Sequence, residues 1–208
     1  MKSLSIVSVF VATLAISGCA STRSDLAKLD ATAPCCATFS EMTFRQKLGR
    51  EPASLEINSD SPVFSFNTGK AFFEGASLDA VTLGAKLEVR TFFYGITAID
   101  AHYFYPVILF LDSSHKILAT VYPERLQFEL FGWDGKATWV GTLPIPPEAR
   151  FAVFHTPRDK VDTKYSGPAV ARGSTYMIGK TFISFPGGNI TAVGNFGGTG
   201  RITTRMVN

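Results

Sequence analysis

The fold is indicated most clearly by the segment Val107–Val121, VILFLDSSHKILATV, in the middle of the chain. Its first part, Val107–Leu111, is a continuous apolar run that predicts a central β-strand covered on both faces. The polar residues Asp112–Lys116 predict a tight turn, and the apolar residues after them predict a second strand. The whole segment is therefore expected to form a β-hairpin.

An alternation of apolar and polar residues continues on both sides of this hairpin. It is clearest in Lys86–Tyr94, KLEVRTFFY, and it recurs in Leu55–Asn58, Leu126–Leu130 and Phe151–Val153. A period of two is typical of half-buried antiparallel strands. Turn-forming residues separate these strands at 67–69, 132–135, 144–147, 186–189 and 197–200. The sequence therefore predicts an all-β fold, an antiparallel and jelly-roll-like β-sandwich, as a single domain over residues 35–208.

Two segments of this domain lack the strand pattern. Ser40–Leu48 is expected to form a short N-terminal helix that is capped by Ser40 and ended by Gly49. Pro157–Thr175 is the least strand-like stretch, and we expect it to be a long loop across one end of the sandwich.

The composition argues against two classes of protein. Of the 208 residues, 46% are hydrophobic and 12% aromatic, so the chain can bury a substantial core and is not disordered as a whole. Only 18% of the residues are charged, and the formal net charge is +3. This small and scattered charge argues against nucleic acid as a partner.

The first residues indicate export. The apolar run Leu4–Ile16 is shorter than the roughly 20 residues that span a bilayer, and it has the length of a signal-peptide core. It leads into Ile16–Cys19, ISGC, which resembles a bacterial lipobox. Residues 1–18 are therefore expected to be a signal peptide and Cys19 the lipidated N-terminus. The alternative is an ordinary signal sequence with a chance cysteine.

Lipidation of Cys19 implies a place in the bacterial envelope. Several acyl chains, such as palmitate, would anchor the protein stably in a membrane. By resemblance to enterobacterial lipoproteins, Ala20 is not the aspartate that favours the inner membrane, so we expect the outer membrane, facing the periplasm. Residues 19–34 are small and polar, and we expect them to form a tether without fixed structure.

Cys35 and Cys36 are adjacent in a chain that has one further cysteine. An oxidising compartment favours a disulfide between them. Such a vicinal turn could present a flat surface to a ligand or act as a structural staple, and an intermolecular bridge is a further alternative. A metal site is not expected, because no second cysteine cluster or nearby histidine completes the spacing of ligands.

No catalytic motif or cofactor site is apparent. His102, His115 and His155 lie far apart without the spacing of metal ligands, so structural roles are expected for them. The chain contains neither a G-x-S-x-G nucleophile elbow nor a phosphate-binding loop. We therefore expect a protein that is not an enzyme and holds no metal or cofactor. The alternative is a hydrolase whose site is assembled from distant residues.

The remaining candidates are aromatic residues that could bind a sugar. Trp133 lies in a Gly-Trp-Asp-Gly turn beside Asp134. Tyrosines flank the start of the central strand, namely Tyr94, Tyr103 and Tyr105. Because aromatic faces stack on pyranose rings and carboxylates bind hydroxyl groups, Trp133, Asp134, Tyr94 and Tyr103 are the predicted ligand-binding residues. Packing in the core or at its rim is the alternative for each ring, and it is the expectation for Trp139.

Three segments resemble one known family. Cys35–Glu41 (CCATFSE), Ser61–Phe73 (SPVFSFNTGKAFF) and Tyr105–Asp112 (YPVILFLD) are similar, in this order, to motifs of the maltose operon periplasmic protein (MalM-type) family. The resemblance spans roughly Cys35–Val121. It implies an envelope protein that is encoded with maltose and maltodextrin uptake genes and has no established enzymatic activity. It supplies no catalytic residues.

Two functions are expected from these features. The first is that of a non-catalytic lipoprotein that assists the uptake of maltose or maltodextrin by weak glycan binding. The alternative is a structural or assembly lipoprotein that contacts an envelope protein through an apolar patch or a sheet edge.

Overall fold

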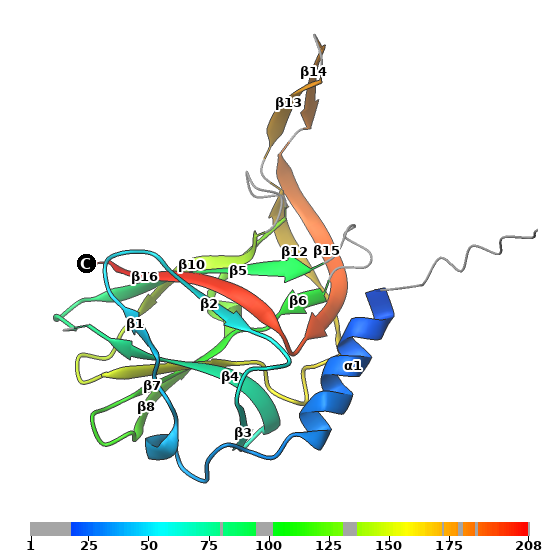
Figure 1. Ribbon diagram of the computed structural model, residues 1–208. Coiled ribbons are helices and arrows are strands. Elements are labelled where there is room, and N and C mark those ends of the chain that lie inside the picture. Colours follow the sequence, from blue (N-terminus) through cyan, green and yellow to red (C-terminus); the bar gives the residue numbers. More distant parts are fainter. Residues whose placement is uncertain are drawn as a thin grey trace, which may run out of the picture.

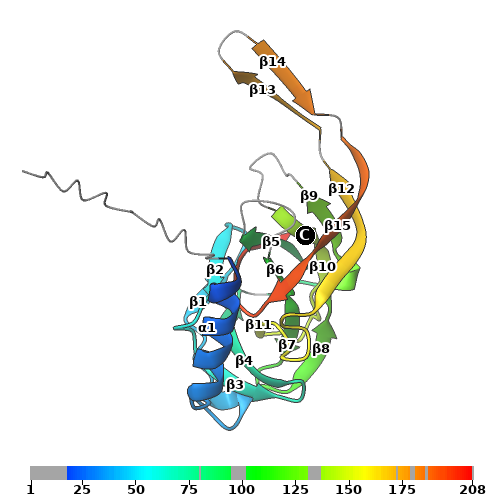
Figure 2. The ribbon, with the colours of Figure 1, turned by 90° about the vertical axis from the view of Figure 1, so that its right-hand side faces the viewer.

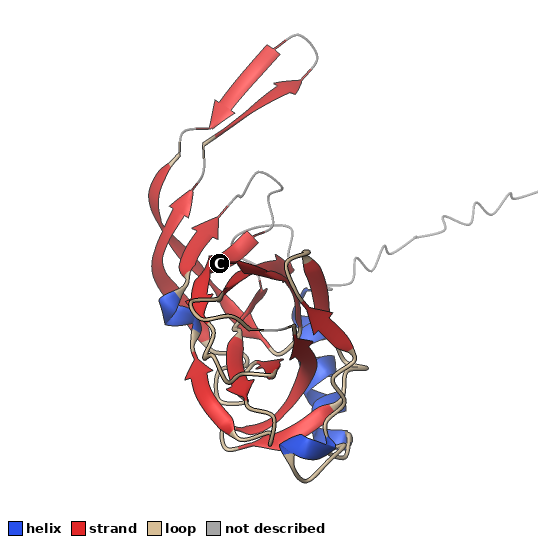
Figure 3. Ribbon diagram, turned by 90° about the vertical axis from the view of Figure 1, so that its left-hand side faces the viewer, coloured by secondary structure: helices blue, strands red, loops and turns tan. Residues whose placement is uncertain are grey.

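The structure is a computed structural model that describes residues 18–79, 81–94, 102–130, 137–171, 173–178, 181–185 and 187–207 (Figure 1). Within these residues the chain is mostly β-strand, as Figure 3 shows, with one α-helix and two single-turn 3-10 helices, η1 (Phe39–Glu41) and η2 (Pro123–Arg125). The strands form two large sheets and one small sheet. The expected all-β sandwich is confirmed.

The first large sheet contains the predicted central hairpin. Its strands are β1 (Gln46–Leu48), β3 (Val63–Phe66), β4 (Gly69–Leu78), β7 (Val107–Leu111), β8 (Ile117–Val121) and β11 (Phe151–His155). They follow the order β1-β4-β11-β7-β8, and β3 pairs with β4. All residues of β7 are buried, as the apolar run predicts. In the turn after it, the Asp112 carboxylate accepts hydrogen bonds from the backbone N–H groups of Ser114 (2.8 Å) and Lys116 (2.9 Å).

The second large sheet has eight strands. They are β2 (Ala53–Ile57), β5 (Lys86–Tyr94), β6 (His102–Phe104), β9 (Gln127–Leu130), β10 (Ala137–Pro144), β12 (Lys164–Ala171), β15 (Gly188–Gly197) and β16 (Gly200–Val207). Their order is β10-β9-β12-β15-β6-β5-β16-β2. Because β10 also pairs with β5, the strands between them form a closed ring of pairings.

The core lies where the apolar faces of the two sheets meet. One continuous cluster of buried side chains includes Phe73 and Phe110 from the first sheet and Leu87, Phe104 and Ile202 from the second. In β5 the alternate residues Leu87, Val89 and Thr91 are buried, as their period of two predicts. Burial of one such aliphatic or aromatic side chain contributes about 1.5–3 kcal/mol, so the cluster is the main source of stability.

An arm of two long strands projects from the body (Figures 1 and 2). Strand β12 pairs with β15 in antiparallel register from Lys164↔Asn195 to Ala171↔Gly188, and the small sheet of β13 (Ser174–Ile178) and β14 (Thr181–Phe185) lies at the outer end. The expectation of a loop over 157–175 is therefore wrong for residues 164–171 and 174–175, which lie in strands. Gly167 and Pro168 hide the strand pattern of β12 in the sequence, and its hydrogen-bonding partner is distant along the chain.

The expected tether is also wrong for most of its length, because Gly18–Ala31 forms the helix α1 beside the body (Figure 1). Leu29 is only 2% exposed and belongs to the core cluster. Asp30 forms an ion pair with Arg158 (3.2 Å), and its carbonyl accepts a hydrogen bond from Lys70 Nζ (2.9 Å). The apolar pattern of residues 18–31 is too weak to predict a helix. Contacts with residues distant along the chain stabilise it instead. The rest of the predicted signal peptide lies outside the described residues.

The helix expected over Ser40–Leu48 is wrong as well. Only η1 is helical there, and Gln46–Leu48 forms β1, which pairs in parallel with residues 76–78 of β4. Leu48 is fully buried, and its carbonyl accepts a hydrogen bond from the Asp79 N–H (2.8 Å). Pairing with the edge of β4 therefore outweighs the local preference of these residues for a helix.

The part of the chain that the structure describes contains no helix that could span a bilayer.

The substitution Leu29→Ala is expected to undock α1. Removing this buried side chain should lower the free energy of unfolding by about 2 kcal/mol, because the helix makes few other apolar contacts with the body. Hydrogen–deuterium exchange would show faster exchange over residues 20–31 and unchanged protection in β4 and β11. Leu26→Ala, at a half-buried position on the same helix, is the matched control and should have a smaller effect. Equal exchange of α1 in both variants would contradict the prediction.

Candidate functional site

A groove of about 520 Å³ opens on the outer face of the first large sheet. Its floor is formed by Val107 and Leu109 of β7, by His155 of β11 and by residues of β8 and its C-terminal end. Because side chains alternate along a strand, Ile108 and Phe110 point to the opposite face, where they are fully buried in the core. The core of the sandwich thereby fixes the floor of the groove.

An aromatic wall borders the floor on the side of β3 and η1. The Phe66 ring stacks on the His155 imidazole with a centroid distance of 3.9 Å and an interplanar angle of 4°. Phe64 lies edge-on to Phe66 at 4.9 Å, and Phe39 lies 5.0 Å from Phe64. Phe39 and Phe66 are half-buried, so each keeps part of its ring open to the groove. On the β8 side, Tyr122 is 46% exposed and lines the groove as well.

His155 is the buried polar group of the floor. It is only 3% exposed, and burial lowers its pKa from 6.5 to about 4, although a hydrogen bond with the Thr156 backbone opposes this shift. The imidazole is therefore neutral at pH 7. Its Nδ1 has no hydrogen-bond partner in the part of the chain that the structure describes. A buried polar atom without a partner costs about 1–3 kcal/mol, so a ligand hydroxyl that bonded to Nδ1 would remove that cost.

No aspartate, glutamate, lysine or arginine is among the described residues that line the groove. The polar groups are two imidazoles, of His115 and His155, the amide of Asn67, and the hydroxyls of Thr38, Ser40, Ser65, Thr68, Ser114, Thr120 and Tyr122. Aromatic rings beside neutral hydroxyl and amide groups suit a neutral, hydroxyl-rich ligand, and they offer nothing to compensate a charged one.

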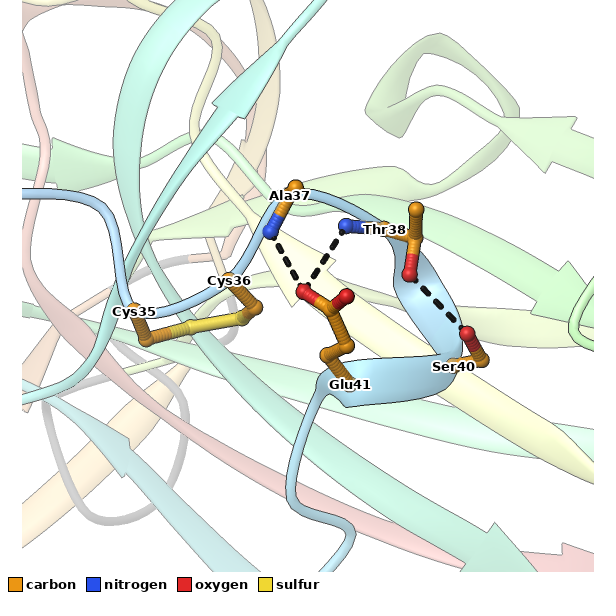
Figure 4. Close-up of a disulfide and its surroundings, with 6 residues drawn as sticks. All are labelled: Cys35, Cys36, Ala37, Thr38, Ser40 and Glu41. Atoms are coloured by element: carbon orange, nitrogen blue, oxygen red, sulfur yellow. Dashed lines mark hydrogen bonds between the residues drawn. A yellow bond between two sulfur atoms is a disulfide. The ribbon is translucent and has the colours of Figure 1, made fainter.

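A vicinal disulfide, drawn in Figure 4, directly precedes Ala37, the first residue of the groove lining. Cys35 and Cys36 are joined, with 3.8 Å between their Cα atoms. A second, shallower cavity lies at this turn and shares Ala37, Phe64 and Ser65 with the groove.

Hydrogen bonds hold the disulfide turn in place. The Glu41 carboxylate accepts hydrogen bonds from the N–H groups of Ala37 (2.7 Å) and Thr38 (3.4 Å), as drawn in Figure 4. The Cys35 N–H donates to the Val63 carbonyl on β3 (2.8 Å). The disulfide, η1 and β3 are thus tied together, and they present a fixed rim to the groove.

Of the four predicted ligand-binding residues only Tyr103 has a described side chain, and it does not line the groove. Trp133 and Asp134 lie outside the described residues, and so does the side chain of Tyr94 on β5. Tyr103 is fully buried, and its ring meets Phe128 edge-on at 5.0 Å. The interpretation of Tyr103 as a sugar-stacking residue is therefore wrong, and core packing, the alternative, describes its position. Trp139 is 5% exposed, so its expected place in the core is confirmed.

The groove residues were not found from the sequence, because five separate segments build the site. Phe64 and Phe66 lie in the SPVFSFNTGK segment that carries the family resemblance, which was the one available signal. His155 was given a structural role on account of its isolation in the sequence. Within the described residues, no cluster of three or more His, Cys, Asp or Glu could hold a metal ion.

Comparison of the chain with protein-family models, with curated proteins and with solved structures finds no significant match. The class of protein is therefore defined by its own fold and site alone. It is an all-β sandwich with an aromatic-walled groove whose described lining contains no Asp, Glu, Lys or Arg.

Alkylation without reductant is expected to leave the protein unmodified at Cys35 and Cys36. In a fragment that starts at residue 20 these are the only cysteines, so its intact mass should be unchanged by iodoacetamide and should rise by two adducts after reduction. Cys36→Ser is the control and should take up one adduct without reductant. Two adducts on the unreduced protein would contradict an intramolecular disulfide.

Proposed function

We propose that the protein is a non-catalytic lipoprotein of the outer membrane that faces the periplasm, binds a neutral glycan weakly in the groove and thereby assists carbohydrate uptake. The observation that carries the proposal is the uncharged lining of the groove, in which Phe39, Phe66 and Tyr122 lie among hydroxyl groups. Pyranose rings pack their C–H faces on such rings and bond their hydroxyls to such groups. The lipobox-like segment at Cys19 supports the location.

The unpartnered His155 Nδ1 supports a hydroxylated ligand in particular. A neutral imidazole has one donor and one acceptor nitrogen, so it can bond a sugar hydroxyl in either tautomer. A phosphate or a carboxylate would find no lysine or arginine in the described lining to compensate the loss of its hydration. The resemblance to the maltose operon family makes maltodextrin the first glycan to test.

Calorimetric titration with maltohexaose is expected to show weak, saturable binding. Tyr122→Ala should weaken it about fivefold, since loss of one stacking ring costs about 1 kcal/mol. Leu83→Ala is the control. Leu83 is 91% exposed and does not line the groove, so this variant should bind like the wild type. Calorimetry is preferred to tryptophan emission, because Trp139 is buried in the core and is not among the described residues that line the groove.

Two further glycans distinguish binding of maltodextrin in particular from binding of glycans in general. Cellohexaose and dextran at the same concentrations test whether the linkage matters. An absence of heat with all three glycans at millimolar concentration would rule out glycan binding in the groove.

The projecting arm favours a second candidate, an assembly lipoprotein that contacts an envelope protein. A two-stranded sheet such as β13–β14 is marginally stable alone and is stabilised when another strand or surface covers it. A photo-crosslinker at Thr175, an exposed position on β13, would test this in intact cells. One dominant protein adduct that is insensitive to added sugar would favour the second candidate over glycan binding.

A further inference from the structure

A further cavity, of about 380 Å³, lies in the eight-stranded sheet at strands β9, β10 and β12. The register explains why it exists. Strand β9 pairs with β12 only at Val170↔Glu129 and Ala171↔Leu130, and the two strands have no further pairing toward Gln127 and Lys164. The resulting gap in the ring of strands is lined by Leu126, Phe128, Trp139, Tyr165, Pro168 and Val170.

Three aromatic rings make one continuous wall of this cavity. Trp139 meets Phe128 at a centroid distance of 4.8 Å and an angle of 64°, and it meets Tyr165 at 5.5 Å and 73°. The Tyr165 hydroxyl donates a hydrogen bond to the Pro168 carbonyl (3.2 Å), and its ring covers Gly167, where a Cβ would lie 2.5 Å from the hydroxyl oxygen. The rings are thus held in place before any ligand arrives.

Trp139, one of the lining residues, carries a buried donor that lacks an acceptor among the described residues. Trp139 is 95% buried, and its Nε1 has no hydrogen-bond partner among the described residues. Buried indole N–H groups in proteins usually find a partner. Here a ligand atom could supply it, and the atom would have to be an acceptor, because an indole N–H only donates.

The charged groups around the cavity restrict the chemical class of the ligand further. Glu124 is the one carboxylate among the described lining residues; it accepts a hydrogen bond from the Tyr105 hydroxyl (2.5 Å) and lies at an exposed position. None of the described lining residues is Lys, Arg or His, so an anion would find no counter-charge. A cation would place positive charge beside the indole N–H.

We propose that this cavity binds an uncharged aromatic compound that carries an acceptor oxygen, with the ring packed among Phe128, Trp139 and Tyr165 and the oxygen bonded to Trp139 Nε1. The volume lies near the lower end of the range of small-molecule sites, which is about 300–1,000 Å³. Water alone could bond to Nε1 but would leave the aromatic wall hydrated, and an aromatic ligand that displaces such water gains affinity.

Acetophenone and ethylbenzene form a pair of probes, because both carry a two-carbon group on a phenyl ring and only the first has an acceptor oxygen. The chain with Cys19→Ser, labelled with ¹⁵N, gives one indole N–H signal for each of its two tryptophans, and Trp133→Phe identifies the signal of Trp139. Acetophenone should move the Trp139 signal saturably to lower field and bind about five times more tightly than ethylbenzene. Val170→Phe, which fills the cavity, should abolish the response, and the exposed Leu83→Phe should not.

Several outcomes would overturn this proposal. They are a Trp139 signal that acetophenone leaves in place, equal binding of the two probes, and a response that persists in Val170→Phe. Displacement of acetophenone by tetramethylammonium would assign the cavity to cations, and a shift of the Trp139 signal by maltohexaose alone would assign it to sugars. The wild-type titration decides the matter even if Val170→Phe does not fold. Because the groove is a separate site, its failure to bind glycans leaves this test unaffected.

Discussion

Replacement of Gly200 by alanine is expected to lower the free energy of unfolding by about 3 kcal/mol. Gly200 is buried at the start of β16, where it pairs with Ile57 of β2. A Cβ at this position would lie 2.4 Å from Cβ and 2.5 Å from Cγ of Phe104, a fully buried residue of β6. Overpacking of a well-packed core typically costs 1–3 kcal/mol, and this contact is at the severe end of that range.

The clash with the Phe104 Cβ makes the prediction specific. A change of rotamer moves the Phe104 ring but leaves its Cβ in place, so β6 and β16 would have to separate. Phe104→Leu should therefore fail to rescue Gly200→Ala. Thermal unfolding should show a melting temperature lowered by about 6–12 °C for a chain of this size.

Gly188→Ala is the matched control for this experiment. Gly188 is exposed on β15, and a Cβ there meets no atom within 4 Å. Because alanine also restricts the unfolded chain, this variant should be neutral or slightly more stable than the wild type. Equal stability of Gly200→Ala and Gly188→Ala would contradict the packing of β6 against β16.

The strands that were predictable from sequence are those whose burial leaves a local pattern. In β2 and β5 the alternation of side chains shows which face meets the core, and in β7 the continuous apolar run shows burial on both faces. These signals are local, because each depends on a few neighbouring residues. They fix the presence of a strand but not its partner, and so the parallel pairs β1–β4, β9–β12 and β15–β6 were not foreseen.

The elements that sequence reasoning missed are held by distant contacts. Helix α1 depends on Leu29 in the core and on the Asp30–Arg158 ion pair, whose partners are 128 residues apart. Strand β12 depends on β15, and β1 depends on the edge of β4. Intrinsic propensity is a weak guide wherever such tertiary contacts dominate.

The candidate site was unpredictable for the same reason. Phe66 and His155 are 89 positions apart and stack only because β3 and β11 lie beside the same strand, β4, and pair with different parts of it. The sequence alone favours exposed aromatic residues in turns as ligand-binding residues. The aromatic wall instead uses half-buried rings on strands, where one edge packs and the other remains open.

Acidification is expected to destabilise the protein by up to about 3 kcal/mol through His155. The pKa of His155 in the folded protein is lowered to about 4 by burial, against 6.5 for an unperturbed histidine. Between these two values the unfolded state binds more protons than the folded state, so stability rises with pH in this window. The contribution is fully present above pH 6.5 and is lost as the pH falls to about 4, where a difference of this size corresponds to about 3 kcal/mol.

Urea unfolding of the wild type and of His155→Phe at several values between pH 7 and pH 4 isolates this effect. The pKa of Glu74 is raised by burial, although the Arg45 charge opposes this shift, so protonation of Glu74 stabilises the fold on acidification and works against the effect of His155. The difference between the two proteins removes that contribution, and it should change across the window from pH 6.5 to 4 in favour of His155→Phe. The stability of His155→Gln, which is polar but does not titrate, should change with pH relative to the wild type in the same way. A difference in the free energy of unfolding that stays constant with pH would contradict a buried neutral histidine.

The same protonation links stability to the proposed function. A charged His155 has no acceptor nitrogen, and its burial against Phe66 becomes unfavourable, so the wall and floor of the groove should separate first. Glycan binding should therefore weaken over the same pH window in which stability falls. In His155→Gln the pH dependence of glycan binding should be smaller than in the wild type over this window, because the imidazole of the floor is absent.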